Sequence, residues 1–147
     1  MRLEFLYGTE TGTAEFVCRD LQEALPDIPS TIISLEDKSL DAFDTDTLHV
    51  IICSTFGAGE LPETAKPFYD RLTSTQPDLS HVRFAMFGLG DTDFDDTFGV
   101  GSELLMKALL ASKATMIGER DVFDASGTDM PEDVAIPWLK NILGRMQ

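Results

Sequence analysis

Residues 2–25, RLEFLYGTETGTAEFVCRDLQEAL, contain the pattern from which the architecture can be predicted. Residues 2–7 are mostly apolar and predict a first strand, and the small and hydroxyl residues after them predict a tight loop. Apolar residues then recur at intervals of three and four, as on the buried face of a helix, at Ala14, Val17, Cys18 and Leu21. The helix is expected to end before Pro26. This strand, loop and helix form the repeating unit of a parallel sheet.

The same alternation of strand and helix patterns continues along the rest of the chain. Further strands are expected at residues 31–35, 48–54, 82–87 and 114–118. Helices are expected at residues 64–72, around Leu104, Leu105, Ala108 and Leu109, and from about Pro137 onward. Pro67 fits the first turn of its helix, where no backbone donor is lost. The apolar residues 48–54 predict a central strand buried on both faces.

These patterns predict a doubly wound α/β fold with a five-stranded parallel sheet, formed by residues 1–147 as a single domain. In such a fold, ligands bind where the carboxyl ends of the strands meet and the topology reverses. The loops after the first, third and fourth strands are therefore the candidate binding segments.

Charge and composition exclude several classes of partner. The chain has 11 Lys and Arg against 26 Asp and Glu, a net charge of −15, which repels nucleic acid and anionic lipid. No apolar stretch reaches the length of a membrane span, and no signal-peptide pattern opens the sequence. Cys18 and Cys53 lie in apolar segments without metal-binding spacing, which favours buried reduced thiols and a cytoplasmic protein.

The loop after the first strand, residues 8–14, has the features of a phosphate-binding loop. Small residues and threonines lead directly into a helix, whose first N–H groups and positive dipole end attract an anion. The loop lacks the Lys of a Walker A motif and is not GxGxxG. The alternative is an ordinary threonine cap at the start of the helix.

The other two loops combine flexible glycines with an aromatic residue. In residues 54–60, Phe56 precedes two glycines that permit a reorientable peptide, although Phe56 could instead fold into the core. In residues 88–98, Phe94 lies among four aspartates. Asp91, Asp93 and Asp95 resemble the start of an EF-hand, but Asp96 and Ser102 replace the required Gly and Glu, so no metal is expected.

An anion cradle and two aromatic platforms at one sheet edge suit a planar ring that carries a phosphate. The sequence resembles the flavodoxin family, especially MioC-type short flavodoxins and the FMN domains of diflavin reductases. The resemblance covers nearly the whole chain and rests on three motifs, YGTETGTAEF, STFGAGELPETAKPFYDRL and FGLGDTDFDDTF. It implies the strand order 2-1-3-4-5 and FMN as the cofactor.

The resemblance also implies the residues that bind FMN. The phosphate is expected on Thr9, Glu10, Thr11, Gly12, Thr13 and Ala14, and the ring between Phe56 and Phe94. The third loop is one residue longer than the family pattern, so either Thr97 or Phe98 follows Phe94 at the ring. The other expected contacts are Ser54, Thr55, Gly57, Ala58, Gly59, Leu89, Gly90, Asp91 and Phe98.

By the same resemblance, the protein is expected to be a monomeric one-electron carrier without catalytic residues of its own. Its donor would be an NADPH-dependent flavodoxin or ferredoxin reductase, and its acceptor a redox enzyme such as a cytochrome P450 or a radical enzyme. The peptide between Gly57 and Ala58 is expected to stabilise the neutral semiquinone. Carboxylates near the ring are expected to disfavour the anionic hydroquinone, because like charges repel each other. These carboxylates belong to Glu60, Asp91, Asp93, Asp95 and Asp96.

Three other functions were weighed against this one. An FMN-dependent NAD(P)H:quinone reductase normally needs more length for a substrate pocket than this chain offers. A signalling receiver domain would need paired acids after the first strand and a Lys after the fifth, where this chain has Gly8-Thr9 and Gly118-Glu119. An interaction domain without flavin would not need the intact phosphate loop.

Overall fold

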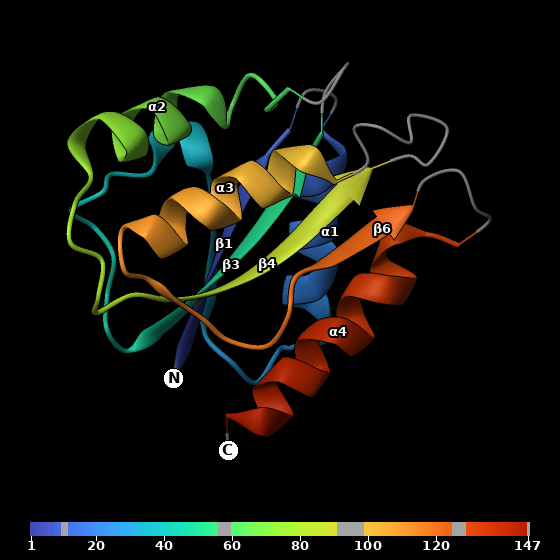
Figure 1. Cartoon of the computed structure of the whole chain (residues 1–147). Coiled ribbons are helices and arrows are strands. Elements are labelled where there is room, and N and C mark those ends of the chain that lie inside the picture. The colour runs from blue at the N-terminus through green and yellow to red at the C-terminus, as the bar shows by residue number, and fades with distance from the viewer. Residues whose placement is uncertain (10–11, 56–59, 91–98, 125–128, 147) are drawn as a thin grey trace.

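The computed structural model describes residues 1–9, 12–55, 60–90, 99–124 and 129–146. Strands and helices alternate along the chain, as the sequence predicts (Figure 1). The elements are β1 (Arg2–Gly8), α1 (Thr13–Ala24), β2 (Ser30–Ser34), the 3₁₀ turn η1 (Leu35–Asp37), β3 (Thr47–Ser54), α2 (Lys66–Thr75), β4 (Arg83–Gly90), α3 (Val100–Ala111), β5 (Thr115–Met116), β6 (Asp121–Asp124) and α4 (Pro131–Arg145).

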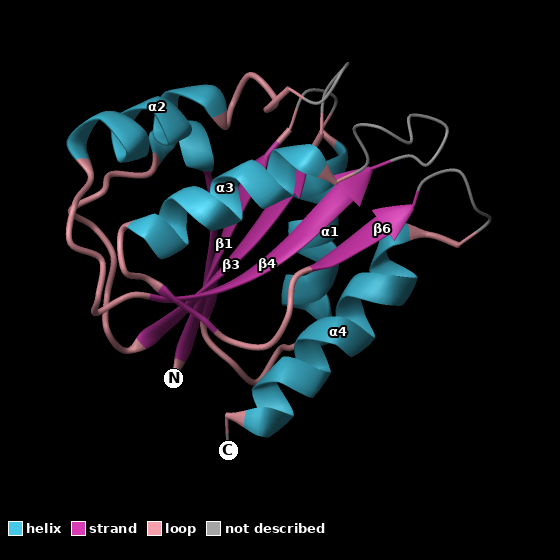
Figure 2. Cartoon of the chain, viewed as in Figure 1, coloured by secondary structure: helices cyan, strands magenta, loops and turns pink. Residues whose placement is uncertain are grey.

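The sheet is parallel and has the order β2-β1-β3-β4-β5, which confirms the predicted topology. Helices cover both of its faces (Figure 2). On one face α1 and α4 pack against side chains such as Phe5 and Val50, and on the other α2 and α3 pack against Leu6 and Ile51. The central strand β3 is buried along its length except at Ser54, as its unbroken apolar sequence predicts.

The fifth position of the sheet differs from the prediction of one strand over residues 114–118. Two short strands, β5 and β6, both pair in parallel with β4, and the sequence analysis missed β6. Between them the chain turns at Gly118, which has a φ of +74° that disfavours other residues. Charged residues precede β6 and only its Phe123 is buried, so the segment carries little hydrophobic pattern.

The last helix begins at Pro131, and the predicted start near Pro137 is wrong. Pro131 occupies the first turn, and the Asp133 carboxylate accepts a hydrogen bond from the Met130 N–H at 3.3 Å. Pro137 lies inside the helix, where it leaves one carbonyl without its usual donor. The burial of four α4 residues against the sheet offsets that loss. These residues are Ala135, Leu139, Ile142 and Leu143.

Other expectations for single residues are confirmed. Pro67 lies in the first turn of α2. Cys18 and Cys53 are buried thiols, and burial raises the pKa of Cys53 to about 12, so this thiol is protonated at neutral pH. No described helix is long and apolar enough to cross a membrane.

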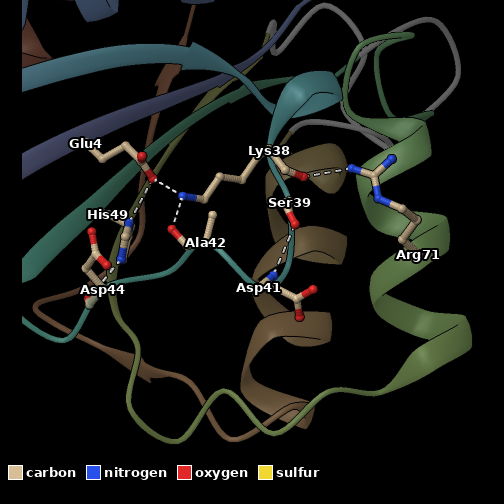
Figure 3. Close-up of polar contacts among 8 residues, drawn as sticks. All are labelled: Glu4, Lys38, Ser39, Asp41, Ala42, Asp44, His49 and Arg71. Atoms are coloured by element: carbon tan, nitrogen blue, oxygen red, sulfur yellow. Dashed lines mark hydrogen bonds and ion pairs between the residues drawn. The ribbon is translucent and has the colours of Figure 1, made fainter.

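A buried polar cluster ties the segment after β2 to the sheet (Figure 3). Lys38 Nζ lies 2.7 Å from Glu4 Oε1 and donates a hydrogen bond to the Ala42 carbonyl at 2.6 Å. His49 Nδ1 lies 3.1 Å from the same Glu4 oxygen, and Nε2 lies 3.3 Å from the Asp44 carbonyl. The side chains of Lys38 and His49 are only 2% and 1% exposed, so water screens these contacts weakly.

The Glu4 carboxylate is expected to make stability depend on acid pH. Burial raises the pKa of Glu4, but hydrogen bonds from His49 and Lys38 outweigh burial and hold this pKa below its ordinary value. Folding therefore favours the ionised form. The stabilisation is present above the unfolded-state pKa of about 4.3 and is lost as the pH falls through the lower folded-state pKa.

Glu4→Gln is expected to lower the free energy of unfolding at pH 7 by about 3–5 kcal/mol, because it leaves the Lys38 ammonium buried without its counter-charge. Chemical denaturation between pH 3 and pH 7 measures this loss and the weaker acid dependence of the variant. The double variant Glu4→Leu with Lys38→Met removes both charges and should lie closer to the wild type at pH 7. Equal stabilities of Glu4→Gln and wild type would contradict this account of the cluster.

Candidate functional site

The carboxyl ends of three neighbouring strands meet at one edge of the sheet, which we call the carboxyl edge. The parallel register aligns Gly8 of β1 with Cys53 of β3, and Ser54 of β3 with Leu89 of β4. The Thr55 N–H donates to the Leu89 carbonyl at 3.0 Å, which extends the pairing one residue beyond β3. The three predicted binding segments therefore all leave the sheet at this edge.

Thr64 anchors the backbone at the end of β1. Its Oγ1 accepts a hydrogen bond from the Thr9 N–H at 2.7 Å and donates one to the Thr9 carbonyl at 3.1 Å. One hydroxyl thus satisfies both backbone groups of Thr9, which is 8% exposed. The sequence analysis missed this role, for which the only signal was a threonine between the second loop and Pro67.

The same threonine, Thr9, sets the start of α1. Its Oγ1 accepts a hydrogen bond from the N–H of Gly12, the N-cap residue, at 2.7 Å. The first N–H bonded within the helix is that of Phe16, which donates to the Gly12 carbonyl at 3.2 Å. The preceding N–H groups have no acceptor inside the helix, and the helix dipole is positive at this end. This turn can bind an anion.

The second loop begins against the first turn of α3. The Gly101 N–H donates to Thr55 Oγ1 at 2.9 Å. A Cβ atom at Gly101 would lie 2.7 Å from the Ser54 carbonyl oxygen and 3.1 Å from Thr55 Cα, closer than side chains tolerate. The glycine therefore lets α3 start in direct contact with the end of β3.

The described residues fit a phosphate monoester at the start of α1. Thr9 contributes a hydroxyl group, and Ala14 is fully buried, which fixes the helix against the sheet. The acidic residue of this turn, Glu15, is paired with Arg19 at 2.6 Å. An anion here meets hydrogen-bond donors, and the Glu15 carboxylate has the Arg19 guanidinium beside it.

Several predicted site residues lie outside the described residues. The structure places Thr9, Gly12, Thr13, Ala14, Ser54, Thr55, Leu89 and Gly90 at the carboxyl edge. The remaining predicted contacts are Glu10, Thr11, Phe56, Gly57, Ala58, Gly59, Asp91, Phe94 and Phe98, none of which is described. The stacking of a ring between Phe56 and Phe94, and the choice between Thr97 and Phe98, therefore stay predictions.

Comparison with known proteins identifies similar chains over nearly the full length. A family model described as Flavodoxin matches residues 5–138. The MioC homologue of Haemophilus influenzae is 33% identical over 143 residues, 97% of both chains. MioC of Escherichia coli K12 is 34% identical over 137 residues, 93% of this chain and 92% of that protein. A cysteine-to-serine mutant of a flavodoxin from Pseudomonas aeruginosa superposes with a TM-score of 0.84 at 29% identity, covering 98% of this chain and 97% of that one.

Gly101→Ala is expected to destabilise the protein by about 1–3 kcal/mol, because the new methyl group meets backbone atoms that cannot move aside. Gly144→Ala is the matched control, because it also replaces a glycine inside a helix, here α4. A Cβ atom at Gly144 has no neighbour within 4 Å. The control is expected to gain about 0.5–1 kcal/mol. Urea unfolding measures both, and a Gly101→Ala variant as stable as the control would refute the close contact.

Proposed function

Because the chain belongs to the flavodoxin family, we propose that it carries electrons from an NADPH-dependent flavodoxin or ferredoxin reductase to a second redox enzyme. FMN is the cofactor and electron transfer is the role. When bound, FMN supplies a ring that takes up and releases electrons singly. The acceptor belongs to the class that includes cytochromes P450 and radical enzymes.

In this proposal the phosphate of FMN lies at the first turn of α1. Thr9 Oγ1 accepts the Gly12 N–H, so the hydroxyl keeps its own hydrogen for a second partner, here a phosphate oxygen. The other donors are the first N–H groups of the helix. The proposed phosphate residues are Thr9, Glu10, Thr11, Gly12, Thr13 and Ala14.

The ring is proposed to lie across the ends of β3 and β4, between Phe56 and Phe94. The hydrogen bond from the Thr55 N–H to the Leu89 carbonyl holds the end of β3 against β4, so the second and third segments leave the sheet from neighbouring strands. Water is displaced from both faces of a stacked ring, and each stack adds about 0.5–1.5 kcal/mol beyond the buried area. The further contacts proposed are Ser54, Gly57, Ala58, Gly59, Gly90, Asp91 and Phe98.

The observation that carries the proposal is the fixed first turn of α1 beside the end of β3. Helix N–H groups and the Thr9 hydroxyl bind an anion without any cationic side chain. This suits a carrier with a net charge of −15, because the surface around the site can stay acidic. An acidic surface attracts partners with a basic docking face and repels other acidic proteins.

Two exposed side chains are proposed as partner contacts near this edge. Phe16, in the first turn of α1, is 68% exposed and gives an apolar contact of the kind that interfaces place at their centre. The Glu60 side chain, which follows the second loop, is 60% exposed and only loosely paired with Lys66 at 3.5 Å. A basic partner can replace Lys66 at this carboxylate.

The purified protein is expected to bind FMN more tightly than riboflavin, because riboflavin lacks the phosphate. Thr9→Val is expected to raise the Kd for FMN about tenfold and to leave the Kd for riboflavin nearly unchanged, since one hydrogen bond to a charged group is lost. Quenching of flavin fluorescence during titration measures all four constants. Equal affinities of the wild type for FMN and riboflavin would overturn the phosphate site.

Reduction of the FMN-loaded protein by a flavodoxin reductase is expected to slow about tenfold or more between 50 and 500 mM NaCl, because salt screens long-range steering. Phe16→Ser is expected to slow reduction at every salt concentration without changing the steepness of the dependence. Glu60→Gln is expected to flatten it slightly. Anaerobic stopped-flow absorbance follows the rate, and a rate insensitive to salt would contradict docking through charge.

A further inference from the structure

Arg120, in the segment before β6, reaches across to the first turn of α3. Its Nη1 donates hydrogen bonds to the Gly99 carbonyl at 3.1 Å and to Ser102 Oγ at 2.8 Å. Its Nη2 lies 3.6 Å from Glu103 Oε2. The side chain is 21% exposed, so these contacts are largely shielded from water.

The Ser102 side chain, which accepts a hydrogen bond from Arg120, is packed in the protein interior. The residue is fully buried, and its Oγ donates to the Gly99 carbonyl at 3.1 Å while it accepts from Arg120. Ser102 fits because Gly88 of β4 has no side chain, since a Cβ atom there would lie 2.9 Å from Ser102 Cβ. The buried hydroxyl is thus a fixed acceptor for the guanidinium of Arg120.

The Gly99 carbonyl is where these contacts converge. It accepts hydrogen bonds from Arg120, from Ser102 and, at 3.1 Å, from the Glu103 N–H. Gly99 directly follows residues 88–98, the third predicted binding segment. Two residues later, Gly101 donates to Thr55 at the start of the second segment. The first turn of α3 is thus fixed to the end of β3 by Thr55 and to the segment before β6 by Arg120.

We propose that Arg120 is a positioning residue for FMN, which acts through Gly99 and Ser102. The inference rests on the proposed function, in which residues of the second and third segments contact the ring. Arg120 sets the position of Gly99, and therefore where the third segment returns to the sheet edge. A guanidinium suits this role because one nitrogen serves two acceptors while a second faces Glu103.

The test measures FMN binding by Arg120→Met and Arg120→Lys. We expect Arg120→Met to raise the Kd for FMN about tenfold, because Gly99 and the first turn of α3 lose the contact that fixes their position. We also expect a change in the visible circular dichroism of the bound flavin at saturation, because its surroundings shift. Arg120→Lys, which keeps the charge and can reach one acceptor, should fall between Arg120→Met and wild type in both readouts.

Lys107→Met is the matched control. Lys107 pairs with Glu103 at 2.9 Å, as Arg120 does more distantly, but it makes no contact with Gly99 or Ser102 in the described part of the chain. Its removal should change the Kd less than twofold and leave the flavin spectrum unaltered. If Arg120→Met does not fold, Ser102→Ala tests the proposal instead. It removes the acceptor of the shorter Arg120 hydrogen bond and should weaken FMN binding several-fold.

The outcomes separate the two proposals. A wild-type chain that binds no FMN overturns the proposed function and this inference with it. A wild-type chain that binds FMN, together with Arg120 variants that match Lys107→Met in Kd and circular dichroism, overturns this inference alone. Weaker binding with an altered flavin spectrum in the Arg120 or Ser102 variants supports it.

Discussion

Hydrogen bonds between threonine hydroxyls and backbone groups hold the carboxyl edge of the sheet together. A parallel sheet ends in N–H and C=O groups that no further strand can pair, and these groups need partners wherever water is excluded. The Thr64 hydroxyl binds the backbone just after β1. The Thr9 hydroxyl accepts a backbone N–H at the start of α1, and the Thr55 hydroxyl accepts one at the start of α3. The positions of both helix starts, and so of the candidate phosphate site, follow from these three side chains.

The buried charged cluster and the proposed binding site lie toward different ends of the strands. The cluster of Glu4, Lys38 and His49 lies nearer the amino ends of β1 and β3, where two charged groups and a histidine are satisfied by one another and by backbone carbonyls. At the carboxyl edge the described contacts of the strand ends are between neutral hydroxyls and amides, and the charged contacts lie on the helices and on Arg120. Among the described residues, the Glu4 carboxylate therefore lies toward the opposite end of β1 from the turn that is proposed to bind phosphate.

The sequence analysis succeeded where a single segment carries the whole signal and failed where packing competes with local preference. The apolar stripe of α1 and the unbroken apolar run of β3 were sufficient, because periodicity reports directly which face is buried. Pro137 misled the assignment of α4, since the burial of that helix outweighs the loss of one hydrogen bond. β6 was missed because its one buried residue leaves no alternation to detect.

The sequence by itself determined the alternation of strands and helices up to β5 and the edge at which the three segments emerge, because periodicity reports both. Its contiguous motifs carried the resemblance to the family and, through it, the cofactor. Only the tertiary structure decided that Thr64 holds Thr9 across 55 positions and that Arg120 holds Gly99 across 21. A hydrogen bond between residues far apart in the chain needs only one donor and one acceptor, and neither leaves a repeating pattern. Such contacts become visible when the fold brings the two residues together.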